Sequence, residues 1–408
     1  MKPTVFPTQP YKGTRDFYPE DLAKRNYIFQ VWRRVLKRNG FLEYETSLLE
    51  NADLYIAKSG QELGGKQLYN FTDKGNRFVA LRPEQTPSLA RLVAHRYREL
   101  KFPLRWFSIP NCFRYEQPQK GRFREHWQLN VDIIGQQAGA VELELLNLVG
   151  ELFKSFGANK QHYKVMYNHR QLLDQWIVRH QLGDYRVLIY TVYDDWFKKT
   201  LAENIRELEN PTDETIAGIS DKSQIQVIVD LAQRAGQSWD SYLEIAKSFD
   251  ELNLVLKHIN EIQPEATYEL NPCIIRGIAY YTGLVFEAFD ENPKNPRALF
   301  GGGRYDNLME LFGKEAHGIG FGWGDATMHE FLSNWNLYPD LTQGGNLVGI
   351  MPFTEADLTK IYLKIIPDLK KHNKRFLIDY DYSRNQEKRW IALKKRGCQE
   401  IIKLNQDS

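Results

Sequence analysis

Glycine occupies every second position of the segment Gly318-Ile319-Gly320-Phe321-Gly322-Trp323-Gly324. Side chains alternate between the two faces of a β-strand, so this spacing predicts a strand with one face made of backbone only. A flat ligand ring could lie on such a face. Close packing against a neighbouring backbone is the competing explanation, because glycines inside strands often mark such contacts. Both explanations require a strand, and a helix is expected to begin near Asp325.

The rest of the chain mixes helical and strand patterns. Apolar residues recur with helical spacing over 20–40, 84–100 and 141–156, and residues 160–270 are mostly helical. Antiparallel strand pairs are predicted for Tyr69–Thr72 with Arg77–Leu81 and for Leu104–Glu116 with Glu125–Gly135, and strand character returns at 273–289. After a linker at 341–345, strands at 346–351, 375–380 and 400–404 alternate with helices at 355–372 and 384–397, which favours a small α/β domain.

The composition excludes several classes of protein. With 42% hydrophobic and 26% charged residues, the chain is typical of soluble globular proteins. No segment reaches the roughly 20 apolar residues of a membrane span, and no signal peptide is recognised. Cys112, Cys273 and Cys398 form no Cys-x-x-Cys pair, so neither a disulfide framework nor a zinc site is expected. A cytoplasmic location with reduced thiols is expected, and the net charge of +2 leaves nucleic-acid binding open.

Two segments carry residues that suit phosphate and nucleotide binding. Arg114 and Glu116 stand two apart in a predicted strand and therefore share one face. The guanidinium can hold a phosphate and the carboxylate can accept a hydrogen bond from a base amine, although an ordinary cross-strand ion pair is the simpler alternative. The loop 120–124 places three cations around a glycine, which suits nucleic-acid contact but also fits a solvated hairpin tip.

Two further segments are less specific. The segment 301–306, Gly-Gly-Gly-Arg-Tyr-Asp, has neither the Gly-Lys-Ser/Thr ending of a Walker loop nor a dinucleotide fingerprint, so it predicts only a turn. The segment 276–283 offers one cation and two phenols in an apolar run. A core strand with hydrogen-bonded tyrosines is the simpler explanation for it.

Taken together and in this order, these segments resemble the motifs of class II aminoacyl-tRNA synthetases, and specifically of the histidyl-tRNA synthetase family. The resemblance covers residues 10–335 and, more weakly, 345–404. The matching segments are Lys12–Phe17 for the N-terminal signature, Phe41–Glu50 for motif 1, Leu81–Thr86 for the Leu-Arg-Pro-Glu-x-Thr segment, Phe113–Gly135 for motif 2, Arg276–Thr282 for the histidine-specific Arg-Gly-Leu-Asp-Tyr-Tyr segment and Gly318–Met328 for motif 3.

The resemblance implies an α+β fold, in which a six-stranded class II antiparallel sheet is flanked by helices. It also implies an inserted helical subdomain, a small, truncated C-terminal α/β domain and a homodimer. The expected division is a catalytic core with motifs 1 and 2 at 1–159, the helical insertion at 160–270, the rest of the core with the histidine-specific segment and motif 3 at 271–340, and a short anticodon-binding-like domain at 345–408.

The implied activity is that of a histidine–tRNA ligase, which converts histidine and ATP to histidyl-adenylate and then transfers histidine to tRNA(His). ATP is a substrate, and Mg²⁺ is expected with it, with unknown ligands. Negative charge develops on phosphoryl oxygens in the first step, so positioned cations should dominate catalysis.

The resemblance also assigns roles to single residues. The catalytic cations at the α-phosphate are Arg114 and Arg276. The ATP-binding residues are Arg114, Glu116, Arg122, Gly322 and Gly324, with Glu116 on the adenine amine. The histidine-binding residues are Glu84, Thr86 and Gln128 at the ammonium group, Asp132 and Tyr281 at the imidazole, and Tyr280. The tRNA-binding residues are Lys120, Arg122 and Arg124.

Three single positions depart from the family pattern. Ser47 replaces the proline of motif 1, Asp132 replaces a glutamate, and Ala279 replaces the aspartate of the histidine-specific segment. The chain also stops soon after its last predicted strand, which leaves anticodon recognition open.

Motif 3 departs most. The run Asp325-Ala326-Thr327-Met328 replaces the family's Gly-Leu-Glu-Arg, so the arginine that holds the γ-phosphate of ATP is absent. Arg304 and Arg122 are the candidate substitutes. Asp325 is expected to cap the helix that follows it.

Two other functions compete with the ligase. One is a non-catalytic paralogue, such as the regulatory subunit of ATP phosphoribosyltransferase in histidine biosynthesis, which binds histidine and charges no tRNA. The other is a tRNA-binding or sensor module without chemistry. The Arg-Gly pair at 276–277, the loop 120–124 and the C-terminal domain favour the enzyme, because a regulator has no evident need of them.

Overall fold

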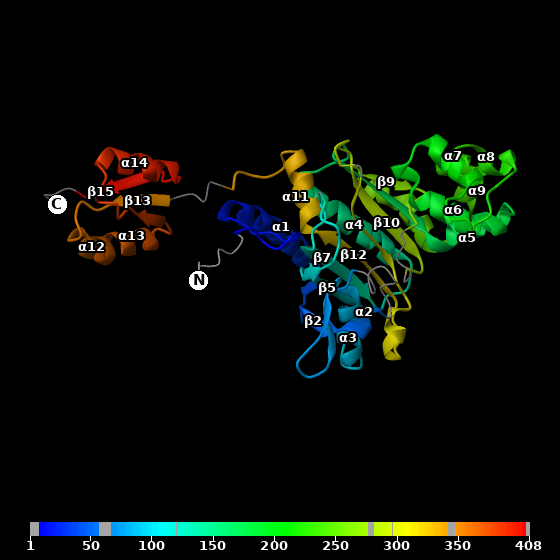
Figure 1. Cartoon of the computed structure of the whole chain (residues 1–408), viewed down its shortest axis with the longest axis horizontal. Coiled ribbons are helices and arrows are strands. Elements are labelled where there is room, and N and C mark those ends of the chain that lie inside the picture. The colour runs from blue at the N-terminus through cyan, green and yellow to red at the C-terminus, as the bar shows by residue number, and fades with distance from the viewer. Residues whose placement is uncertain are drawn as a thin grey trace, which may run out of the picture. The chain divides into compact units, whose positions relative to one another are not determined.

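The computed structural model describes residues 8–56, 67–119, 121–275, 281–295, 297–341 and 347–404. The chain divides into two compact units (Figure 1). The larger unit comprises Met1–Tyr18 and Lys24–Leu337, and the smaller one comprises Pro19–Ala23 and Tyr338–Ser408.

A large sheet forms the centre of the larger unit. Six neighbouring strands, β5, β7, β12, β11, β10 and β8, run antiparallel, which confirms the expected six-stranded sheet. The edge strands β1 and β9 are added in parallel, and the short β6 pairs with β7. The spatial order is β1 (Leu42–Glu43), β5 (Leu104–Ser108), β7 (Glu125–Ile134), β12 (Gly318–Gly324), β11 (Ala298–Arg304), β10 (Leu284–Asp290), β8 (Tyr163–His169) and β9 (Thr267–Leu270), with β6 at Asn111–Phe113.

The glycine-alternating segment is the predicted strand, β12, but its glycine face is not bare. A Cβ at Gly320 would lie 2.4 Å from Oδ1 of Asp132, and one at Gly322 would lie 2.2 Å from Nε2 of Gln128. The glycines therefore make room for side chains of the neighbouring strand β7.

The prediction of a turn at 301–306 was wrong. Residues 301–304 lie in β11, between β10 and β12. A Cβ at Gly302 would lie 2.2 Å from the carbonyl oxygen of Gly320, so the glycines allow two strand backbones to pack closely.

The opposite face of β12 packs against helices α1 (Pro19–Arg38), α4 (Ala140–Ser155) and α11 (Asp325–Asn334). Trp323 of β12 is fully buried. Its ring stacks on Phe300 with centroids 4.1 Å apart, and it contacts Phe153 of α4 at 4.7 Å and Trp32 of α1 at 5.9 Å. Because helices occupy this face, a ligand has access only to the glycine face.

A smaller antiparallel sheet lies beside the large one. It contains the predicted strand pair β3 (Asn70–Thr72) and β4 (Phe78–Leu81), together with β2 (Leu49–Asn51). The nearby helices are α2 (Ala52–Ile56), α3 (Thr86–His95), which is shorter than predicted, and the 3₁₀ turn η4 (Leu308–Phe312).

The helical part of the chain connects two strands of the large sheet, β8 and β9, which pair in parallel. Tyr193 and Trp176 tie its helices together, because their side chains donate to the carbonyl oxygens of Ile228 and Ser238. Its elements are α5 (Arg170–Arg179), η2 (Gly183–Tyr185), α6 (Arg186–Asp194), η3 (Trp196–Lys198), α7 (Leu201–Glu209), α8 (Lys222–Ala232), α9 (Gly236–Ala246) and α10 (Asp250–Ile262).

The smaller unit contains a parallel sheet in the order β14, β13, β15. Arg389 is buried and binds the carboxylate of Asp379 at 3.0 Å and the carbonyl of Pro352 at 2.9 Å. The elements are β13 (Leu347–Met351), α12 (Asp357–Lys360), the π-helical turn η5 (Ile361–Ile365), α13 (Ile366–Lys371), β14 (Arg375–Ile378), α14 (Gln386–Lys395) and β15 (Glu400–Lys403). In the described ranges of both units, every helix is too short or too polar to cross a bilayer.

Candidate active site

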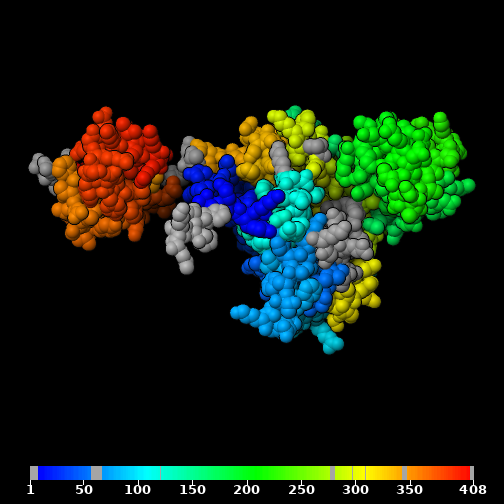
Figure 2. Space-filling model, in the orientation of Figure 1, coloured from blue at the N-terminus to red at the C-terminus, as the bar shows by residue number. Residues whose placement is uncertain are grey.

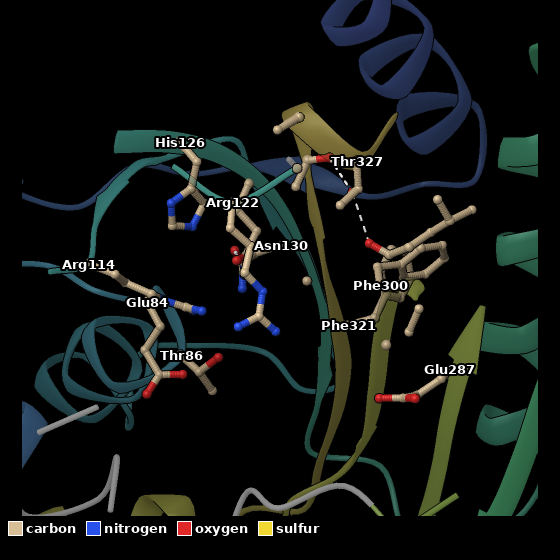
Figure 3. Close-up of a pocket in the computed structure, with 18 of the residues that line it drawn as sticks. Glu84, Thr86, Arg114, Arg122, His126, Asn130, Glu287, Phe300, Phe321 and Thr327 are labelled. Atoms are coloured by element: carbon tan, nitrogen blue, oxygen red, sulfur yellow. Dashed lines mark hydrogen bonds between the residues drawn. The ribbon is translucent and has the colours of Figure 1, made fainter. Parts of the chain in front are cut away.

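A cavity of about 430 Å³ opens over the glycine face of β12 (Figure 3). It brings together residues from the segments that the sequence singled out, although these lie up to 240 positions apart along the chain. The predicted residues that line it are Glu84, Thr86, Arg114, Glu116, Arg122, Gln128, Asp132, Tyr281, Gly322 and Gly324.

One wall carries Glu84 and Thr86, at the start of α3. The preceding Arg82 is buried and fixes this wall from behind. Its guanidinium donates to the carbonyl oxygens of Asn111 at 2.8 Å and Thr46 at 2.9 Å, and more weakly to that of the divergent Ser47 at 3.4 Å. The backbone around Ser47 therefore still supports the wall.

The cavity also contains two cations, and Arg114 lies next to the wall that carries Glu84. Strand β6 ends at Phe113, so Arg114 and Glu116 lie just beyond the strand and not on it. Nε of Arg114 donates to the carbonyl of Pro83 at 2.8 Å, and Nη1 lies 4.0 Å from Glu116. Nη1 of Arg122 lies 3.7 Å from the other oxygen of Glu116. Figure 3 shows both guanidinium groups directed into the cavity.

The deepest polar group is Asp132 on β7, which is 2% exposed. The hydroxyl of Tyr305 donates to its Oδ1, while Oδ2 is buried without a hydrogen-bond partner in the described part of the chain. Burial raises the pKa of Asp132 to about 7, against the opposing effect of the Tyr305 hydrogen bond. This arrangement provides an acceptor for a polar ligand group. Tyr305 was missed from the sequence because it lies in the segment interpreted as a turn.

His126 also lines the cavity and was not predicted. Burial, with the nearby charges of Arg114 and Arg15, lowers its pKa to about 3. The ring is therefore neutral at neutral pH and contributes a flat, uncharged surface.

The run that replaces the motif 3 signature contributes only small side chains. Ala326 and Thr327 line the cavity, whereas Met328 is fully buried. The Thr327 hydroxyl lies 2.9 Å from the carbonyl oxygen of Leu299 and 3.0 Å from that of Gly324. Positions 326 and 327, and not 328, are thus the positions of this run from which a longer side chain would enter the cavity.

Three sequence expectations need correction. Asp325 does not cap α11, because it is the first helical residue and its carboxylate binds Arg15 and the amide of Trp127. Arg304 cannot replace the missing arginine, because it is buried against Glu142, 2.5 Å away.

Arg124 does not suit the expected tRNA contact. It is 6% exposed, and its guanidinium donates to the carbonyl of Glu116 and to the hydroxyl of Tyr11. Four other residues that the sequence singled out, Lys120, Arg276, Ala279 and Tyr280, lie outside the described residues.

The family model described as histidyl-tRNA synthetase matches residues 13–324. A histidine–tRNA ligase of Leptospira biflexa is 39% identical over 98% of this chain and 92% of its own. The chain belongs to the histidyl-tRNA synthetase family. The chloroplastic and mitochondrial histidine–tRNA ligase of Arabidopsis thaliana is 37% identical over 82% of this chain and 68% of its own.

Solved structures of this family share the fold. Histidyl-tRNA synthetase from Nostoc sp. PCC 7120 has a TM-score of 0.76 at 21% identity, over 96% of this chain and 90% of that one. A protein from Bacillus halodurans, described as an ATP phosphoribosyltransferase regulatory subunit/histidyl-tRNA synthetase, has a TM-score of 0.72 at 20% identity, over 98% and 99%. The fold of the histidyl-tRNA synthetase family is therefore present over nearly the whole chain.

Proposed function

We propose that this chain is a histidine–tRNA ligase, which forms histidyl-adenylate from histidine and ATP and then charges tRNA(His). The observation that carries this proposal is that one cavity contains both the guanidinium groups of Arg114 and Arg122 and buried acceptors such as Asp132. Such a cavity suits a reaction between a phosphate-bearing substrate and a cationic amino acid.

On the ATP side, Arg114 stabilises the charge that develops on the α-phosphate when the histidine carboxylate attacks it. Glu116 accepts a hydrogen bond from the adenine amine, and Arg122 adds a second cation from the loop. Pyrophosphate leaves, and the terminal ribose of the tRNA then attacks the adenylate.

On the histidine side, Glu84, Thr86 and Gln128 hold the ammonium group. Asp132 and Tyr281 face the imidazole, and Tyr305 positions the carboxylate of Asp132. Buried polar groups left unpaired by other amino acids provide selectivity.

Mg²⁺ enters with ATP. The described residues hold no group of three or more His, Cys, Asp or Glu side chains able to bind a metal. That fits an ion held mainly by substrate phosphates with one or two carboxylates, and Glu287 on the cavity wall is the carboxylate that would contact it. The ion neutralises phosphate charge when bound.

We further propose a cytoplasmic homodimer. Exposed apolar side chains gather around the motif 1 region and the smaller sheet, where Leu42 is 66%, Phe71 49% and Phe78 41% exposed. A second copy of the chain would cover them. Lys120 and Arg122 meet the tRNA acceptor end, and the α/β domain at 345–408 meets the anticodon.

The alternative is a histidine-binding regulatory paralogue. It is favoured by the loss of the phosphate-binding arginine from 325–328 and by the likeness to the Bacillus halodurans protein. Histidine-dependent exchange of pyrophosphate into ATP separates the two. The purified enzyme should catalyse exchange with histidine and with none of the other amino acids. Histidine binding without exchange would refute the ligase in favour of the regulator.

A further inference from the structure

A buried ion pair lies behind the ATP side of the cavity. Asp325 is 2% exposed, and both of its oxygens accept from Nη2 of Arg15, at 3.0 and 2.9 Å. Oδ1 also accepts from the backbone N–H of Trp127 at 3.0 Å. These partners lie 310 and 198 positions away in the sequence.

Aromatic rings shield this pair from water. The Arg15 guanidinium lies over Phe123 at 4.3 Å and Phe17 at 5.1 Å, and its Nε is buried without a hydrogen-bond partner among the described residues. Arg25 stacks in the same cluster, 4.3 Å from the ring of Trp127. Asp325 depends on this pair most, because its side chain is 3% exposed whereas that of Arg15 is 17% exposed.

The pair joins three segments that form the cavity. Asp325 directly precedes Ala326 and Thr327, Phe123 directly follows Arg122, and Trp127 lies between the cavity residues His126 and Gln128. The backbone N–H of Arg124 also donates to the carbonyl of Gly13 at 2.7 Å. In Figure 2 the N-terminal segment, in dark blue, lies against cyan residues of the segment that leads into β7.

We propose that Arg15 and Asp325 are positioning residues for ATP. They fix the loop that carries Arg122 and the start of α11 relative to β7, so that the phosphate site keeps its geometry in a chain that lacks the motif 3 arginine. The histidine side has its own supports, since Arg82 holds the wall of Glu84 and Tyr305 holds Asp132. Substitution of either residue of the pair should therefore weaken the use of ATP more than the binding of histidine. This inference rests on the proposed function.

The test uses the full-length chain and three variants. Arg15→Met removes the charge and keeps most of the packing. Asp325→Asn removes the charge and keeps an acceptor for the Trp127 amide. The double variant carries neither charge. Each single variant should raise the KM for ATP in pyrophosphate exchange about tenfold or more, since small displacements of reacting groups are costly. The Kd for histidine, measured by calorimetry, should stay within about twofold of wild type.

The double variant separates positioning from stability. Removing both charges of the pair should restore the melting temperature toward the wild-type value, because neither member of the pair is then left as a charge without its partner. The KM for ATP should stay high. Recovery of both the melting temperature and the KM for ATP would overturn the proposal. A loss of histidine affinity as large as the loss of ATP affinity in the single variants would also overturn it.

Arg105→Met is the matched control. Arg105 of β5 forms a bidentate pair with Glu144 of α4 at 2.7 and 2.9 Å, and neither residue lines the cavity. The KM for ATP of the Arg105→Met variant should match wild type. A rise as large as that in the Arg15→Met variant would count against a specific role for Arg15. If wild type shows no exchange, the proposed ligase fails, and the pair is then judged by calorimetric affinities for ATP and histidine in the same variants. Unchanged ATP affinity in Arg15→Met would refute positioning.

Discussion

The two sides of the cavity differ in how firmly their groups are fixed. On the histidine side, Asp132 is 2%, Glu84 5% and Tyr281 7% exposed. On the ATP side, the side chains of Arg114 and Arg122 are 25% and 58% exposed and come from the segment beyond β6. A small substrate that must be distinguished from similar ones calls for buried, pre-formed partners. A polyphosphate can be held by cations that also reach solvent. The family pattern is altered most on the ATP side, at 325–328, although Asp325, Ala326 and Met328 are themselves buried.

The largest effect should come from the ATP side. Arg114→Ala should lower the kcat of pyrophosphate exchange by about 10²–10³, because a positioned donor to developing charge contributes roughly 3–4 kcal/mol. Histidine affinity should change much less, because Arg82 still holds the wall of Glu84 when the Arg114 bond to the carbonyl of Pro83 is lost. Near-normal turnover would remove Arg114 from the catalytic role.

A pH dependence should arise on the histidine side. The raised pKa of Asp132, about 7, means that its carboxyl group is largely protonated at pH 6 and largely ionised at pH 8. The ionised form is the better acceptor for an imidazole N–H, so histidine affinity should increase with pH across this window. Relative to Asp132→Asn, the wild-type gain should approach about tenfold.

The same carboxyl group links pH to stability. Its pKa in the folded protein lies above the unfolded value of about 4, so the folded state holds this proton more tightly between roughly pH 4 and 7. Its contribution to the free energy of unfolding therefore decreases as pH rises through that window.

The predicted pH dependence of histidine affinity can be tested by calorimetric measurement of histidine binding from pH 6 to 8, with Asp132→Asn as control. The same dependence of histidine affinity on pH in the two proteins would exclude Asp132 as the source of the effect.

A smaller effect on the same side should follow from Tyr281→Phe. Loss of one hydrogen bond to the imidazole costs about 1 kcal/mol, or roughly fivefold in histidine affinity. ATP binding should not change, because the proposed role of Tyr281 is a contact with the imidazole and not with the phosphates. Equal histidine affinity in the two proteins would contradict the assignment of Tyr281.

The sequence predicted the elements better than their long-range partners. The alternation in 318–324 is local, so β12 could be recognised from spacing. Three consecutive glycines in 301–303 carry no period, and only pairing with β10 and β12 makes that segment a strand. Arg304 looked available as a cation, but its partner Glu142 is 162 positions away. Asp325 likewise pairs with Arg15 and does not cap its own helix. Such pairings depend on tertiary packing, which periodicity does not contain.

The smallest expected effect tests whether the missing arginine still matters. Thr327 faces the cavity, so Thr327→Arg would return a guanidinium to the phosphate side. Because Arg114 and Arg122 already place two cations in the cavity, the KM for ATP should fall only a few-fold, about the contribution of one charge-assisted hydrogen bond at a partly exposed position. Histidine affinity should be unchanged. Thr327→Lys is the control, since it restores the charge without the planar donor geometry.

The outcome of this substitution would sharpen the contrast between the two sides. A lower KM for ATP would mean that the phosphate side tolerates the loss of a cation and retains space for it, as expected for groups that reach solvent. A higher KM would mean that small side chains at 326 and 327 are required by the present geometry. The ATP side would then be as closely fitted as the histidine side.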